Sequence, residues 1–225
     1  MASQFIHITL PDGTRKQVPT GCTVRDALTP TGGRLDGKIL AAKVNGAPMD
    51  LFHALDQDAT VEPLTFESAE GREVYRHSST HIMAQAVKEV FPTAQLTIGP
   101  ALEDGFYYDF AFDRPFTPED LEQIEARAIE ITKRSLTVSR SELSKADAIK
   151  FFQDRGEAYK VKLINSFEDG SPISLYRQGE FVDLCRGPHL PTTGYVGAFK
   201  LLSTGGAYWR GDERNPMLQR VYGTS

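Results

Sequence analysis

The chain has 225 residues, of which 40% are hydrophobic and 24% are charged, with a formal net charge of −5 and a pI near 5.6. This apolar content is enough to bury a core in one or two domains, and it excludes a globally disordered chain. The acidic balance argues against a protein that coats nucleic acid through a broad basic face, although a domain that grips only the end of a strand needs few phosphate contacts.

Targeting and membrane signals are not found in the sequence. The first residues do not form a basic segment ahead of an apolar block, and the longest apolar runs are far shorter than the roughly 20 residues of a membrane helix. Cys22 and Cys185 are the two cysteines, too few for a disulfide framework, so we expect reduced thiols. We therefore expect a soluble cytoplasmic protein with no membrane partner.

The first 65 residues predict a small β-rich unit with one helix. Ile6, Ile8 and Leu10 alternate along a strand, residues 11–14 are typical of a turn, and residues 15–18 return as the partner strand. Further signals are a helix from Thr23 to Leu28, a strand from Ile39 to Val44, the hairpin dipeptide Asn45-Gly46 and a strand from Ala59 to Leu64. This order predicts a β-grasp (ubiquitin-like) domain at residues 1–65. His7 and His53 are expected at its surface.

Residues 66–225 predict a larger α+β domain in which helices come first and an antiparallel sheet follows. Residues 67–71 are the expected linker. The helices are predicted at 72–91, from the cap Thr117-Pro118 with a buried stripe of Leu121, Ile124, Ala128 and Ile131, and from Ser144 to about Arg155. The strand-like runs are 161–164, 174–176, 181–183, 198–202, 207–209 and 217–222.

Two short motifs hold three of the five histidines and one of the two cysteines. In His77-Ser-Ser-Thr-His81, positions i and i+4 share one face of a helix, so both imidazoles point into one pocket. In Cys185-Arg-Gly-Pro-His189, glycine and proline forbid a helix, so a shaped loop is expected. Four soft or borderline ligands that converge are what a zinc site or an acyl-hydrolysis site requires. The pattern lacks the glutamate of His-Glu-x-x-His, which disfavours a zinc peptidase with that base.

A longer series of motifs resembles the threonyl-tRNA synthetase family of bacterial type, in order and at the family's spacings. These motifs are Arg76-His-Ser-Ser-Thr-His81, Ile98-Gly-Pro100, Asp104-Gly-Phe-Tyr-Tyr-Asp109, Tyr159-Lys-Val161, Asp183-Leu-Cys-Arg-Gly-Pro-His189 and Gly206-Ala-Tyr-Trp-Arg-Gly-Asp212. The segment Met217–Thr224 resembles the entry to that family's aminoacylation core, and residues 1–65 resemble its TGS domain. The resemblance covers essentially the whole chain.

The resemblance implies that residues 66–225 are an editing domain. The class II core, which uses ATP and a zinc ion and builds the homodimer of the family, would follow residue 225. We therefore expect an excised fragment that does not charge tRNA and that is monomeric.

The implied activity is hydrolysis of the ester in seryl-tRNA(Thr), with the 3′ acceptor end of tRNA(Thr) as the partner. His77 is expected to position or activate water, with Lys160 as co-base or oxyanion stabiliser. His81, Cys185 and His189 would line the pocket and complete the catalytic group. Asp183 would orient a histidine or bind the seryl ammonium group.

Other residues are expected around the substrate. Tyr108 would contact the adenosine or be a core tyrosine with a satisfied hydroxyl, Arg186 would meet a phosphate or be solvated, and Pro100 would line the binding site. Trp209 is expected in the core or at a sheet edge. Lys200, Arg210, Arg214 and Arg220 make the carboxy-terminal segment locally basic, either as an acceptor-stem contact or as a solvated face.

Metal content and reaction class stay open at this level. A metal-free site is favoured, in which histidine and lysine activate water directly and no cofactor is needed. In the zinc variant His77, His81, Cys185 and His189 would be the ligands of a metal-bound hydroxide. Cys185 as a nucleophile would add a thioester step that ester hydrolysis does not need. The competing classes are a zinc-dependent hydrolase of a small ester or amide and a non-catalytic tRNA-binding module.

Overall fold

The computed structural model describes residues 5–170 and 172–225, which divide into two compact units. The first unit is Met1–Tyr75 with Gly187–Pro191, and the second is Arg76–Arg186 with Thr192–Ser225. Within the described ranges, no helix combines the length and the apolar character needed to cross a membrane. The predicted domain bounds, 1–65 and 66–225, remain a prediction.

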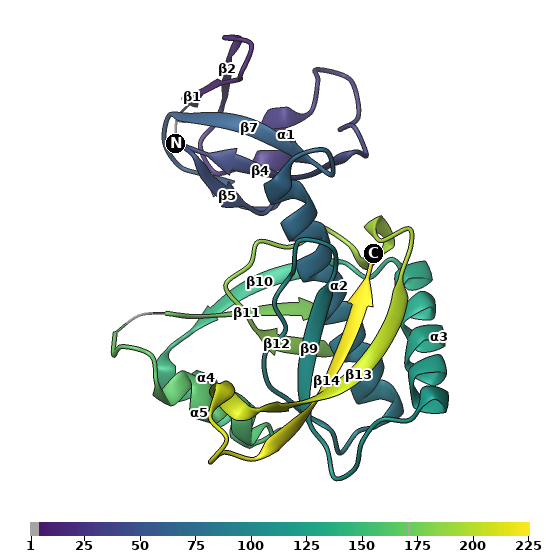
Figure 1. Ribbon diagram of the computed structural model, residues 1–225. Coiled ribbons are helices and arrows are strands. Elements are labelled where there is room, and N and C mark those ends of the chain that lie inside the picture. Colours follow the sequence, from purple (N-terminus) through teal and green to yellow (C-terminus); the bar gives the residue numbers. More distant parts are fainter. Residues whose placement is uncertain (1–4, 171) are drawn as a thin grey trace. The chain divides into compact units, whose positions relative to one another are not determined.

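The first unit contains a five-stranded sheet in the order β2-β1-β7-β4-β5 (Figure 1). Its strands are β1 (Phe5–Thr9), β2 (Arg15–Pro19), β4 (Ile39–Val44), β5 (Ala47–Met49) and β7 (Ala59–Thr65). β1 pairs with β7 in parallel and the other neighbours are antiparallel. The short strands β3 (Cys22–Thr23) and β6 (Ala54–Leu55) form a separate pair. This arrangement confirms the β-grasp-like prediction.

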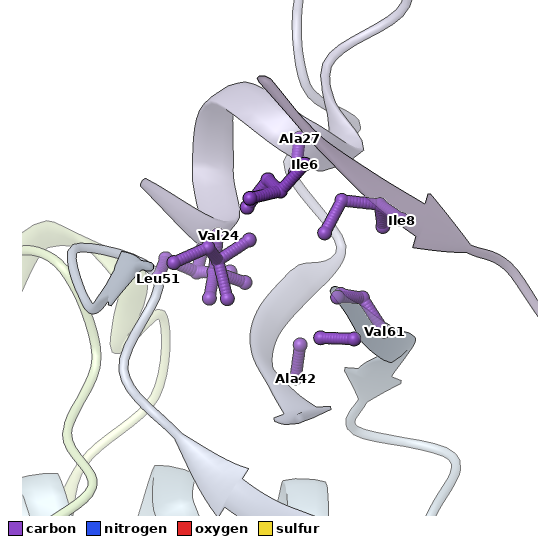
Figure 2. Packing of buried hydrophobic residues seen from close by; sticks show 9 residues of the cluster. Ile6, Ile8, Val24, Ala27, Ala42, Leu51 and Val61 are labelled. Atoms are coloured by element: carbon purple, nitrogen blue, oxygen red, sulfur yellow. The ribbon is translucent and has the colours of Figure 1, made fainter. Parts of the chain in front are cut away.

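The core of the first unit lies between this sheet and the helix α1 (Val24–Leu28). Alternation along β1 buries Ile6 and Ile8, and Val24 and Ala27 of the helix meet them, as Figure 2 shows. The predicted helix start at Thr23 is a complete capping box with Asp26. The capping box sets the start of the helix and alternation sets the buried side of the strand. The apolar side chains of both elements therefore face one core.

The second unit contains two antiparallel sheets. One has the order β13-β14-β9-β8 and the other the order β10-β11-β12. The bounds are β8 (Gln95–Leu96), β9 (Phe106–Ala111), β10 (Val138–Leu143), β11 (Ile173–Gln178), β12 (Phe181–Leu184), β13 (Lys200–Tyr208) and β14 (Met217–Thr224). Figure 1 shows β9, β14 and β13 side by side, with a helix running along β13.

Four helices and two short 3-10 turns complete the described chain: α2 (Ala69–Val90), α3 (Pro118–Arg134), α4 (Lys145–Gln153), α5 (Ala158–Asn165), η1 (Thr193–Tyr195) and η2 (Trp209–Gly211). Thr117 caps α3 with a capping box, and the predicted stripe of Ile124, Ala128 and Ile131 is buried. Ser144 caps α4 as predicted. The predicted α+β class is confirmed.

Several predicted elements differ from the structure. Residues 161–164 were predicted as a strand, but they lie in α5, where Lys160 and Ile164 are buried at helical spacing. Three apolar residues and one lysine are too few to separate the helical from the strand period, and the burial of distant contacts decides. The linker prediction for 67–71 is wrong in part, because α2 already begins at Ala69.

The sheet was also predicted incompletely. The runs 198–202 and 207–209 were predicted as two strands. They belong largely to one strand, because β13 extends from Lys200 through Gly205-Gly206 to Tyr208. The strand β9 was missed because aromatic side chains lie on both its buried face and its partly buried face, so apolar and polar residues do not alternate clearly. β10 was missed as well, although it pairs with β11 along its full length.

Candidate functional site

The second unit forms an open cavity of about 730 Å³ where five secondary-structure elements, α2, β9, α5, β11 and β12, and the loops next to them meet. α2 contributes His77 and His81, α5 contributes Lys160, and β12 contributes Asp183, with Cys185 following in the next loop. Pro100 and Arg186 are exposed and also line this space. The volume lies within the range of small-molecule sites, roughly 300–1,000 Å³.

The two histidines of α2 point to the same side of the helix, as their spacing predicts. Their rings are 5.5 Å apart between centroids and nearly perpendicular, with an interplanar angle of 89°. His81 is buried and also meets the ring of Phe181 edge-on at 6.3 Å. Gln178 on β11 donates to the backbone carbonyl of His81 at 3.2 Å and so ties this turn of the helix to the sheet.

Lys160, Asp183 and Tyr108 form a fully buried polar triad beside the histidines. The Lys160 ammonium lies 2.6 Å from Asp183 Oδ1, and the two side chains are 3% and 1% exposed. The Tyr108 hydroxyl donates to Asp183 Oδ2 at 2.8 Å and accepts from Lys160 Nζ at 3.0 Å. His81 Nε2 lies 3.9 Å from Asp183 Oδ2. A charge-assisted network of this kind fixes the position of the lysine.

Cys185 is placed against the first histidine of α2. Its Sγ lies 3.3 Å from His77 Nε2, and Ser174 donates to the Cys185 carbonyl at 2.5 Å. The possible ligand atoms of His77, His81 and Cys185 all lie within 4.8 Å of one another. The second unit therefore brings together two imidazoles, the thiol and the lysine that the sequence predicted as one site.

His189 is described with the first unit, because residues 187–191 group with that unit. Its side chain is buried, and its backbone amide donates to Asp50 Oδ1 at 2.7 Å. The loop after β12 contains no helix, as Gly187 and Pro188 predict. The role of His189 as a member of the site remains a prediction.

Burial sets the protonation of the two cavity histidines. It lowers the pKa of His77 to about 4 and the pKa of His81 to about 3, and the nearby Asp183 carboxylate opposes this only in part. Both imidazoles are therefore neutral at pH 7 and able to accept a proton.

The pKa values of the Asp183 carboxyl group and the Tyr108 phenol shift in opposite directions. Burial by itself would raise the pKa of Asp183, but the charge of Lys160 and hydrogen bonds from Lys160 and Tyr108 outweigh it and lower the pKa. Burial raises the pKa of Tyr108, and the Asp183 charge raises it further. The triad at pH 7 thus consists of an ammonium group, a carboxylate and a neutral phenol.

Tyr108 occupies a core position and its hydroxyl is satisfied within the triad. Gly99 lies directly on its ring: a Cβ at this position would come within 2.2 Å of Tyr108 Cδ2. The glycine of the Ile98-Gly-Pro100 motif is therefore required for the loop backbone to pack on the aromatic wall of the cavity.

The sequence did not single out the cavity residues at the end of α5 and in the loop after it. Leu163, Ser166 and Phe167 line the cavity. These are common residue types without a motif, so only their tertiary position identifies them.

Three of the four basic residues near the carboxyl terminus are paired with acids. Lys200 lies 2.8 Å from Glu125, Arg214 lies 2.7 Å from Asp212, and Arg220 holds Asp109 through two hydrogen bonds. Arg210 instead donates to the Ser166 hydroxyl at 3.0 Å. Trp209 is buried against Tyr159. The segment is therefore largely neutralised by its partners.

Sequence comparison adds the family to this geometry. Residues 6–65 match the TGS domain, and residues 173–222 match the threonyl and alanyl tRNA synthetase second additional domain. The chain is 54% identical over 223 residues to a threonine–tRNA ligase of Symbiobacterium thermophilum, which covers 99% of this chain and 34% of the relative. It is 55% identical over 221 residues to the enzyme of Acidithiobacillus ferrooxidans, with 97% and 34% covered.

A third relative, the threonine–tRNA ligase of Citrifermentans bemidjiense, is 53% identical over 220 residues, with 98% of this chain and 34% of the relative covered. The chain thus spans about a third of the length of the curated relatives that it matches. It carries a TGS domain followed by the second additional, editing-type domain of the threonyl-tRNA synthetases, and it is related to the bacterial members of that family over nearly its whole length.

Proposed function

We propose that this chain hydrolyses the ester bond of seryl-tRNA(Thr), in the cytoplasm, as the proofreading part of a threonine–tRNA ligase. The observation that carries the proposal is the buried Lys160–Asp183 pair beside His77 in one cavity. The cavity offers a neutral base, a fixed cation and space for an aminoacylated nucleoside. The match to the second additional domain supports the choice of an aminoacyl-tRNA as substrate.

The physical need for such a site follows from the two amino acids. Serine is threonine without one methyl group, and a synthetic site that binds the amino and hydroxyl groups of threonine accepts serine as well. One missing methyl group discriminates by only about 10–200-fold. A second site that is too small for the methyl group removes the error by hydrolysis.

In the proposed reaction His77 accepts a proton from a water molecule, whose oxygen attacks the carbonyl carbon of the seryl ester. The carbonyl oxygen becomes an oxyanion, and the ammonium group of Lys160 stabilises it. The bond between the carbonyl carbon and the ribose oxygen then breaks, and the proton held by His77 passes to that oxygen. The products are serine and tRNA with a free terminal hydroxyl.

The triad supports oxyanion stabilisation rather than the co-base role for Lys160. Its amino group donates to both Asp183 and Tyr108, and an ammonium group in an ion pair has no lone pair to accept a proton. Asp183 would hold the charge and the position of Lys160, and Cys185 would orient the ring of His77 through the 3.3 Å contact.

A zinc ion is the second candidate for water activation. Thiolate and imidazole are preferred zinc donors, and His77, His81 and Cys185 are close enough to share one ion, with His189 as the fourth ligand that the sequence suggests. A bound zinc ion would lower the pKa of a coordinated water to about 7. We favour the metal-free route because Lys160 already supplies a fixed positive charge in the cavity.

The test uses tRNA(Thr) charged with radiolabelled serine or threonine and the full 225-residue chain. We expect selective release of serine, and His77→Ala should lower this rate about 10²–10⁴-fold. His53→Ala is the matched control, because His53 is exposed in the first unit. Equal loss of serine and threonine, or an unchanged rate in His77→Ala, would contradict the proposal.

A further inference from the structure

The cavity accommodates only the end of an aminoacyl-tRNA. Its volume of about 730 Å³ falls in the range of sites for single small molecules, roughly 300–1,000 Å³, so it has room for one aminoacylated adenosine. His77 and Lys160, the proposed catalytic pair, lie in its wall. The phosphate that joins this adenosine to the preceding nucleotide must then lie where the cavity opens to solvent, next to exposed side chains.

Ser166 connects the cavity wall to an exposed arginine. It follows α5 directly and lines the cavity. Its hydroxyl donates to the carbonyl of Leu163 at 2.7 Å, which leaves its lone pairs directed away from the helix. Arg210 Nη2 donates to this oxygen at 3.0 Å. The guanidinium group is thereby tied to a residue of the cavity wall, although Arg210 itself does not line the cavity, and its remaining N–H groups are available for another acceptor.

The turn that carries Arg210 is held in place by aromatic packing and by backbone hydrogen bonds. Trp209 is buried and packs edge-on against Tyr159 of α5, with 4.9 Å between the ring centroids. The Trp209 backbone is fixed from both sides, since its amide donates to the Pro216 carbonyl at 3.1 Å and its carbonyl accepts from Asn215 at 2.9 Å. The guanidinium group of Arg210 lies 5.6 Å from the centre of the indole ring. The same helix therefore positions both Lys160 and, through Trp209, Arg210.

Arg210 has a left-handed backbone, with φ of 57°, at a position that is not glycine. Such a conformation is uncommon for a long side chain and is retained where the surrounding structure fixes it. Here the left-handed backbone turns the Arg210 side chain toward Ser166. The other basic residues of this hairpin form ion pairs with carboxylates.

The charges at the cavity edge favour an anion. Among the residues that the structure describes, no carboxylate forms an ion pair with Arg210 or with Arg186, which is exposed and lines the cavity after Cys185. Two acids line the cavity: Asp183 pairs with Lys160, and Glu168 pairs with neither arginine. Neither guanidinium group therefore has a counter-charge among the described residues. Such groups next to a site for the end of a nucleic acid can form charge-assisted hydrogen bonds to a backbone phosphate.

We propose that Arg210, tied to the cavity wall by Ser166, binds the phosphate that joins the terminal adenosine of the substrate to the preceding nucleotide. This inference rests on the proposed function. It assigns to the hairpin between β13 and β14 a part in substrate binding but none in the chemistry, because Arg210 reaches the cavity only through Ser166.

The test compares two non-hydrolysable ligands, 3′-(serylamino)-3′-deoxyadenosine with and without a 5′-phosphate, by calorimetry on the full chain. We expect the phosphate to increase the affinity of the ligand about tenfold through its contact with Arg210. Arg210→Gln should remove this factor for the phosphorylated ligand and leave the other ligand unaffected, and Arg210→Lys should restore part of it. Arg214→Gln is the matched control, because Arg214 lies in the same hairpin and pairs with Asp212.

Three results would be decisive. Loss of the phosphate effect in Arg210→Gln but not in Arg214→Gln supports the inference. Equal affinity of the unsubstituted chain for both ligands, or a full phosphate effect in Arg210→Gln, overturns it and leaves the proposed function standing. Failure of both ligands to bind removes the proposed function itself, and the phosphate site with it.

Kinetics provide an independent readout with seryl-tRNA(Thr). Arg210→Gln should raise KM about tenfold at unchanged kcat, because the arginine binds a part of the substrate that does not react. The logarithmic dependence of binding on salt should become shallower by about 0.7, the value for one contact with a single-stranded phosphate. A fall in kcat at unchanged KM would contradict the assignment.

Discussion

Lys160 Nζ lies 2.6 Å from Asp183 Oδ1, and both side chains are almost completely buried, at 3% and 1% exposure. Ions removed from water are costly, and the cost is offset only by good geometry and by further hydrogen bonds. The Tyr108 hydroxyl provides these, since it bonds to both partners. The fold therefore holds the charged Lys160 side chain at the cavity, where it can stabilise a negative charge that develops during the reaction.

Removal of the carboxylate should destabilise the protein strongly. Asp183→Asn leaves the Lys160 ammonium buried without a counter-charge, and we expect the free energy of unfolding to fall by about 3–5 kcal/mol. Urea denaturation at pH 7 measures this. The double variant Lys160→Met, Asp183→Leu should recover most of the stability and none of the hydrolysis. The control Asp212→Asn affects an exposed pair and should not change the stability measurably. An Asp183→Asn variant as stable as the unsubstituted chain would contradict this view of the pair.

The pH dependence of hydrolysis should differ from that of an ordinary histidine base. Burial lowers the pKa of His77 from 6.5 to about 4, so its basic form persists to lower pH. We therefore expect the enzymatic rate, corrected for spontaneous ester hydrolysis, to be level from about pH 8 to about pH 5 and to fall below that as the imidazole gains a proton. An inflection near 6.5 in the rate would show that His77 is more solvated in solution. NMR titration of the histidine ring protons provides the matching site-specific value.

The free energy of unfolding should also depend on the protonation of His77 and His81. An unfolded histidine binds a proton near pH 6.5, whereas His77 and His81 bind one only near about 4 and about 3 in the folded chain. Between these values the unfolded state binds more protons, so stability is complete above pH 6.5 and decreases as the pH falls toward 4. The double variant His77→Gln, His81→Gln should weaken this dependence, as thermal unfolding between pH 4 and pH 7 would reveal. An unchanged slope would assign the dependence to other residues.

The metal-free proposal makes a simple analytical prediction. Protein purified without added metal should contain zinc well below one equivalent, and its rate of serine release should persist after dialysis against a chelator. Elemental analysis and the deacylation assay on the same sample measure both quantities. One equivalent of zinc, with activity lost on chelation and restored by zinc, would favour the metal-dependent route through His77, His81 and Cys185.

Glu157 should affect catalysis from outside the cavity. Its buried carboxylate precedes α5, lies 2.7 Å from Lys88 Nζ and accepts from the backbone amide of Leu96 at 2.8 Å. Glu157→Ala leaves the Leu96 amide without its acceptor and removes the counter-charge of Lys88, which keeps its hydrogen bonds to two backbone carbonyls. The start of the helix that carries Lys160 is thereby loosened. We expect a loss of about 1.5–3 kcal/mol in unfolding free energy and a lower kcat. Glu130→Ala, in an exposed pair with Arg127, is the control and should change neither quantity.

Much of the site was predictable from residue type and spacing. The i, i+4 relation places His77 and His81 on one side of α2, and the turn residues after Asp183 predict the loop that carries Cys185. The β-grasp-like unit was equally accessible, because strand alternation, the Thr23 capping box and Asn45-Gly46 are local signals. Asn45 and Gly46 indeed both have positive φ, at 50° and 86°.

Other features depended on contacts between distant segments. The run 161–164 became helical because Lys160 and Ile164 share a buried face, and no window of four residues contains that information. β9 was hidden because aromatic side chains lie on both of its faces, so apolar and polar residues do not alternate clearly. The link between Ser166 and Arg210 joins residues 44 positions apart and has no motif at either end.

Residue type and spacing were enough to predict the local elements with strong caps and turns, the side of α2 that carries the two imidazoles and the family to which the motifs belong. Folding was needed to show that Tyr108 completes the triad, that burial lowers the pKa of both histidines and that Arg210 is bonded to Ser166 of the cavity wall. The reason is physical: caps, turns and periodicity act over a few residues along the chain, whereas ion pairing and desolvation depend on which distant side chains folding brings within a few ångströms.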